Sequence, residues 1–83
     1  MKAIELIDNL FTMDDELTKN AATYIVHCTN CTMEDLNHGE FLRNLATWAA
    51  NKNGENVKDV LTAVKAEYDA RQIATLKDIL SVI

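Results

Sequence analysis

Proline is absent from these 83 residues, and glycine occurs only at Gly39 and Gly54. Both residue types interrupt helices, proline because it lacks a backbone N–H and glycine because of its conformational freedom. Apolar residues recur at helical spacing along almost the whole chain. These features predict an all-α fold, a compact bundle of four or five short helices in a single helical domain over residues 1–83.

Basic residues are scarce: eight lysines and arginines stand against 13 aspartates and glutamates, for a net charge of −5. Phosphate binding needs clustered positive charge, so nucleic acid is disfavoured as a partner and a basic protein surface is favoured. Long apolar runs are missing too. Acidic residues interrupt the N-terminal segment, and no stretch reaches the ~20 apolar residues that span a membrane. We therefore expect a cytoplasmic protein with no membrane partner.

The N-terminal part of the chain predicts two helices. The first covers about residues 2–11, and the second runs from about Met13 to Asn30. Thr12 is the expected N-cap of the second helix, because its hydroxyl can accept a hydrogen bond from a free backbone N–H. The residues of the second helix that are expected to face the core are Leu17, Ala21, Tyr24, Ile25 and Cys28.

Glycine and asparagine mark the helix ends in the rest of the chain. Residues 37–39 are expected to interrupt it before a third helix begins near Phe41, which Gly54 ends in a left-handed conformation. Asn56 can cap the next helix. Asp69 resembles the start of a capping box for a last helix, with one continuous helix over residues 56–82 as the alternative. The expected core residues are Phe41, Leu42, Leu45, Ala46, Trp48, Ala49, Val57, Val60, Leu61, Val64, Tyr68, Ile73, Leu76, Leu80 and Ile83.

Cysteine and histidine form one weak cluster. A structural zinc site has four ligands, and three of them can come from Cys28, Cys31 and His38. His27 points about 100° away from Cys28 on a helix, so it does not easily complete the site. A thiolate is disfavoured near a helix C-terminus. The sequence therefore predicts no metal and no cofactor. Cys28 is expected in the core, and Cys31 is expected to pack against Leu36 as a hydrophobic staple.

Acidic residues gather at two expected helix starts, after Thr12 and after Thr32, which is expected to cap a further segment. The helix dipole favours negative charge at these positions, which accounts for part of the pattern. Two acidic helix starts also make a patch for a basic partner. The candidate partner-binding residues are Asp14, Asp15, Glu16, Glu34 and Asp35.

The sequence favours binding over chemistry, because its two histidines have neither a nucleophile nor a glycine-rich loop beside them. It predicts no catalytic residue, no enzyme, and a small acidic protein-binding module that covers a surface of a larger protein. Phage-encoded inhibitors and accessory proteins act in this way. The comparison with these viral proteins is an analogy at the level of the fold class and rests on no residue match.

Three alternatives stay open. A helix-turn-helix-like DNA-binding regulator would use residues 37–68, although its reading helix lacks a basic footprint. A Cys/His metal or redox module is the second alternative. The third concerns the apolar C-terminal helix, which either docks on the core or forms an interface with a partner or with a second copy of the chain, as in a homodimer.

Overall fold

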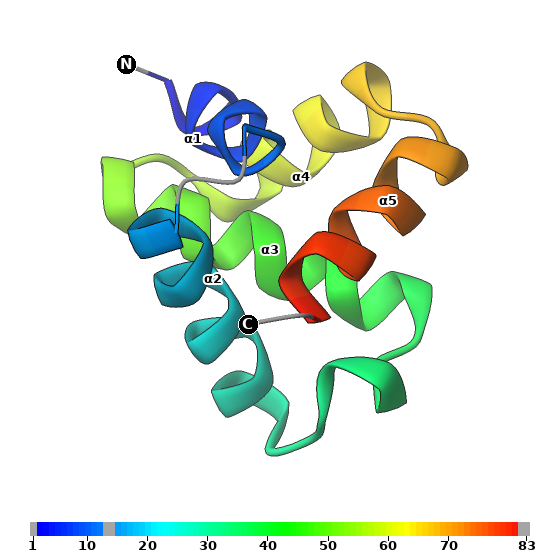
Figure 1. Cartoon of the computed structure of the whole chain (residues 1–83). Coiled ribbons are helices and arrows are strands. Elements are labelled where there is room, and N and C mark those ends of the chain that lie inside the picture. The colour runs from blue at the N-terminus through cyan, green and yellow to red at the C-terminus, as the bar shows by residue number, and fades with distance from the viewer. Residues whose placement is uncertain (1, 13–14, 82–83) are drawn as a thin grey trace.

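The computed structural model of the chain describes residues 2–12 and 15–81, and over these residues five α-helices and one 3-10 helix follow one another without a β-strand (Figure 1). The predicted all-α class and the predicted range of helix number are confirmed. The elements are α1 (Ala3–Leu10), α2 (Asp15–Thr29), η1 (Met33–Asp35), α3 (His38–Asn53), α4 (Val57–Glu67) and α5 (Ala70–Ser81).

Helix α3 lies in the middle of the bundle and packs against α1, α2 and α4, while α5 packs against α2 and η1 (Figure 1). Buried apolar side chains from all six elements form one cluster. Phe41 and Trp48, both predicted to be core, are among its largest fully buried side chains. The eight buried residues of α3 are Phe41, Leu42, Asn44, Leu45, Ala46, Trp48, Ala49 and Ala50.

Several helix ends form as the sequence predicts. Gly54 has a φ of 66° and ends α3 in the left-handed conformation. The Asn56 side chain accepts a hydrogen bond from the Lys58 backbone N–H at 2.9 Å. The Gln72 side chain accepts a hydrogen bond from the Asp69 backbone N–H at 3.0 Å, and the Asp69 side chain accepts one from the Gln72 backbone N–H at 2.8 Å. This reciprocal pair is a capping box. This box begins α5 separately from α4, so the alternative of one continuous helix over residues 56–82 is wrong.

The start of α3 was predicted too late. The helix begins at His38, because the Asn37 side chain accepts a hydrogen bond from the Glu40 backbone N–H at 2.8 Å. The Asn37 amide in turn donates to the Glu40 carboxylate at 2.6 Å. Gly39 therefore lies inside the first helical turn, and the interruption falls before it. A capping residue ahead of glycine outweighs the low helix propensity of glycine here.

The C-terminal end of α2 falls within one residue of the predicted end at Asn30. The helix ends at Thr29, because Asn30 takes a φ of 54° and the Cys31 backbone N–H donates to the Val26 carbonyl at 3.3 Å. This is the 6→1 hydrogen bond of a Schellman motif, in which asparagine can replace glycine.

The predicted start of α2 at Met13 lies outside the described residues. Thr12, its predicted cap, donates its hydroxyl hydrogen to the Asn9 carbonyl at the end of α1, at 2.6 Å. The predicted core position of Ile83 also lies outside the described residues, while Ile73, Leu76 and Leu80 of α5 are buried as predicted.

Both cysteine predictions are wrong, because Cys28 and Cys31 are exposed. The buried stripe of α2 runs through Thr18, Ala21, Ala22 and Ile25 and continues at Thr29, which is half-buried. Cys28 lies about 100° around the helix from Thr29 and falls just beyond the Ala21 edge of that stripe. Met33, rather than Cys31, is the buried neighbour of Leu36 in this part of the chain.

Candidate binding surface

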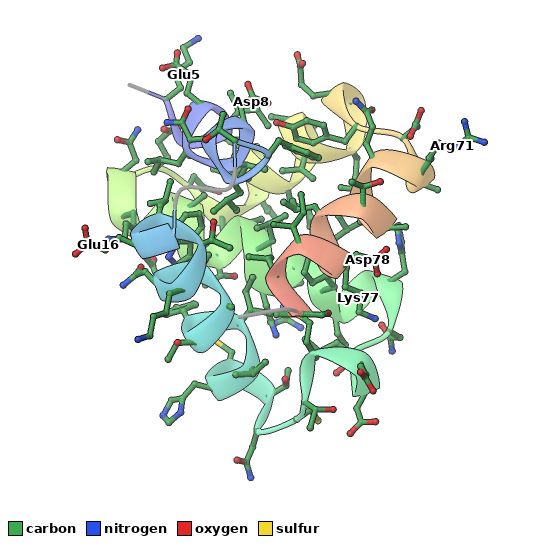
Figure 2. All side chains as sticks on the ribbon, viewed as in Figure 1. Glu5, Asp8, Glu16, Arg71, Lys77 and Asp78 are labelled. Atoms are coloured by element: carbon green, nitrogen blue, oxygen red, sulfur yellow. The ribbon has the colours of Figure 1, made fainter. Side chains whose placement is uncertain are left out.

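The predicted acidic residues lie at two separate places. Asp14 is outside the described residues, and Asp15 is the first residue of α2. Glu16 is exposed in the first turn of that helix, where Figure 2 shows it projecting away from the body of the molecule. Glu34 and Asp35 are exposed in η1, and the Thr32 hydroxyl accepts a hydrogen bond from the Asp35 backbone N–H at 3.3 Å. The predicted cap at Thr32 is thus confirmed.

Helix α2 separates the two acidic places. Glu16 is near its N-terminal end, whereas η1 follows its C-terminal end. A helix of 15 residues is about 22 Å long at 1.5 Å per residue. The structure therefore does not bring Glu16 together with Glu34 and Asp35, and the acidic residues form two patches instead of one.

A groove of about 530 Å³ runs along the exposed face of α2. It begins at Glu16 and ends at Cys28, so it follows the helix for about three turns. The described residues that line it all belong to α2, and most of its lining is apolar carbon. We call this surface the α2 groove. Its lining residues are Glu16, Lys19, Asn20, Thr23, Tyr24, His27 and Cys28.

Two hydrogen bonds hold side chains of the α2 groove against α3. The Asn20 side-chain oxygen accepts from the Trp48 indole N–H at 2.8 Å, and the Tyr24 hydroxyl accepts from the Asn51 amide at 2.9 Å. Burial and the neighbouring Cys28 thiol raise the pKa of the Tyr24 hydroxyl, while the hydrogen bond from Asn51 lowers it. These contacts fix two of the side chains that line the groove.

Sequence reasoning found one end of the α2 groove and missed the rest. Lys19, Thr23 and His27 follow Glu16 at intervals of three and four residues, which places them on one helix face. That spacing was a usable signal. The ties from Asn20 and Tyr24 to α3 had no sequence signal, since they join residues 27 or 28 positions apart.

The cysteines and histidines do not form a metal site within the described residues. No group of three or more histidine, cysteine, aspartate or glutamate side chains in that part of the chain is arranged to hold an ion. Cys28 and Cys31 are free thiols, and His38 belongs to the first turn of α3. The structure therefore does not gather the three residues considered as zinc ligands.

The helix considered for DNA reading is α4. Its exposed side chains include Lys58 and Lys65, but also Asp59 and Glu67. The positive charges are thus interleaved with negative ones, whereas a DNA-binding helix presents a basic face. A DNA-binding role stays an untested alternative.

None of the helices in the described ranges is both long and apolar enough to cross a lipid bilayer. No family model, no curated protein and no solved structure matches this chain.

Proposed function

We propose that this chain is a small protein-binding module that covers a surface of another protein through the α2 groove. The observation that supports the proposal is the groove itself, an exposed and largely apolar channel that polar side chains border along α2. Protein interfaces combine an apolar centre with a polar rim in the same way. A role as an inhibitor or accessory protein in the cytoplasm, of the kind phages encode, belongs to this proposal.

The charge at the start of α2 indicates the chemistry of the partner. Asp14, Asp15 and Glu16 are consecutive in the sequence, and Glu16 is both exposed and part of the α2 groove. A basic partner surface would be attracted to this end before close contact forms. Glu34 and Asp35 form the second acidic patch, one helix length away, and would contact the rim of a large partner.

Site-specific photo-crosslinking tests the proposal. A photoreactive amino acid replaces Thr23, which lines the α2 groove, and in a matched variant it replaces Thr75, which is exposed on α5. The tagged variants are crosslinked in the native cell, and the products are identified by mass spectrometry. We expect one protein with a basic surface to be crosslinked from position 23 and not from position 75. The same product from position 75 alone would exclude the α2 groove as the binding surface.

A further inference from the structure

The polar side chains along the α2 groove have a symmetric order. Glu16, Asn20, Thr23 and His27 are spaced by four, three and four residues, which is the same spacing in both directions. On an α-helix these four positions fall within a strip about 60° wide, centred opposite the buried stripe. Two copies of this strip can therefore face each other when the two helices run antiparallel about a two-fold axis.

The chemistry of the strip is complementary in that arrangement. Glu16 of one copy lies opposite His27 of the other, so a carboxylate meets an imidazole that can donate an N–H. Asn20 lies opposite Thr23. The Asn20 oxygen already accepts from Trp48, which leaves its amide hydrogens to donate to a hydroxyl. Each contact occurs twice because the interface is isologous.

We propose that a second copy of this chain occupies the α2 groove, in an antiparallel contact that pairs Glu16 of each copy with His27 of the other. The inference rests on the proposed function in one respect, since both use the α2 groove as a contact surface. A second copy and a foreign partner then compete for the same side chains, so self-association decreases when the partner binds.

Charge exchange across the two-fold axis tests the contact. The variants are E16K, H27E, the double variant E16K/H27E, and D78K as a control with the same charge change as E16K at an exposed position of α5. Sedimentation equilibrium over a concentration series measures the dimer dissociation constant. Residues 16 and 27 are about 16 Å apart along one helix, so they interact only between copies.

We expect the unmodified chain and D78K to dimerise with similar dissociation constants. Each single variant removes the native pair at both of its symmetric positions: E16K leaves a lysine opposite His27, and H27E leaves two glutamates opposite each other. Either change should weaken the dimer about tenfold. The double variant restores both pairs with reversed polarity and should dimerise again. An equimolar mixture of E16K and H27E should form a heterodimer, because one contact then joins a lysine to a glutamate and the other is the native pair of Glu16 and His27. Circular dichroism confirms that every variant is folded.

A monomeric unmodified chain at all concentrations would refute the self-contact, as would single variants that dimerise normally or a mixture that stays monomeric. These results leave the proposed function standing if position 23 still crosslinks a basic partner. Conversely, a dimer that follows the charge exchange, together with crosslinks from position 23 to this chain alone, would support the self-contact and refute a foreign partner for the groove.

Discussion

Trp48 is the side chain whose role is clearest at the scale of single residues. Only 2% of its surface is exposed, and its indole N–H donates to Asn20. Trp48→Ala should lower the free energy of unfolding by about 3–5 kcal/mol, because it leaves a cavity in the core and removes the hydrogen bond to Asn20. Urea unfolding followed by circular dichroism measures the loss. The native fluorescence should be blue-shifted; red-shifted emission with near-normal stability of the variant would mean that Trp48 is a surface contact.

Thr18 is a polar residue that is buried in the apolar core. Only 1% of its surface is exposed, and its hydroxyl has no hydrogen-bond partner among the described residues. Thr18→Val should therefore raise the free energy of unfolding by about 1–3 kcal/mol, since it removes an unsatisfied hydroxyl and keeps the shape. Thr62→Val is the matched control, because the exposed Thr62 hydroxyl donates to the Lys58 carbonyl at 2.9 Å. Equal effects of the two substitutions would contradict the argument.

At the scale of the elements, a helix end depends on capping residues that are close to it in the sequence. Several helix ends were therefore predictable. The capping box of Asp69 and Gln72, the cap at Asn56 and the left-handed Gly54 each involve residues at most four positions apart. Where two local signals compete, the sequence does not show which one wins. Asn37 and Gly39 are such a case, and the cap prevailed.

The candidate site was predictable only where it depends on one helix. Glu16 was identified from its position at a helix start, and its exposure fits that prediction. The shape of the α2 groove depends on how α2 lies against α3, through the bonds of Asn20 to Trp48 and of Tyr24 to Asn51. Contacts between helices arise from packing, which periodicity alone does not specify.

Helix α5 is an integral part of the core. Ile73, Leu76 and Leu80 are buried, and the Lys77 ammonium donates to the Leu36 carbonyl. Each buried side chain contributes about 1.5–3 kcal/mol, so deletion of residues 73–83 removes an amount comparable to the whole stability of about 4–12 kcal/mol. The truncated chain should lose its helical circular dichroism signal. Leu76→Ala, which should cost about 2–5 kcal/mol, is the milder test. A folded truncated monomer would show that α5 is dispensable.

Helix α1 is capped by a distant residue. The Glu55 carboxylate accepts hydrogen bonds from the Asn53 amide and from the Ala3 backbone N–H, and these bonds lower the pKa of Glu55. A lowered folded-state pKa stabilises the fold above the ordinary glutamate value of about 4.3, and this stabilisation is lost as the pH falls through the folded-state pKa. Glu55→Gln should therefore flatten the acidic limb of the stability–pH curve. Parallel curves for both proteins between pH 2 and 6 would contradict the capping role.

At the scale of the whole molecule, the fold leaves the two acidic patches at opposite ends of α2 and the α2 groove between them. A partner that covers this side therefore meets negative charge before it meets carbon surface. Charges at the rim of an interface mainly set the association rate and its salt dependence, while buried contacts set the dissociation rate. The two patches can be separated experimentally because residues 16 and 34 belong to different elements.

The acidic start of α2 should set the association rate with the partner that photo-crosslinking identifies. Asp14→Lys combined with Glu16→Lys should slow association several-fold at low salt and leave dissociation nearly unchanged. Glu34→Lys combined with Asp35→Lys should have a smaller effect, because the second patch lies outside the α2 groove. Glu67→Lys combined with Asp78→Lys, at two exposed positions outside α2, matches the change in net charge. Melting temperatures control for the helix-dipole interaction, worth about 0.3–1 kcal/mol per residue. Surface plasmon resonance at several salt concentrations measures the rates. If the rates and their salt dependence stay those of the unmodified chain, the acidic start of α2 serves the helix alone, and steering by this patch is excluded.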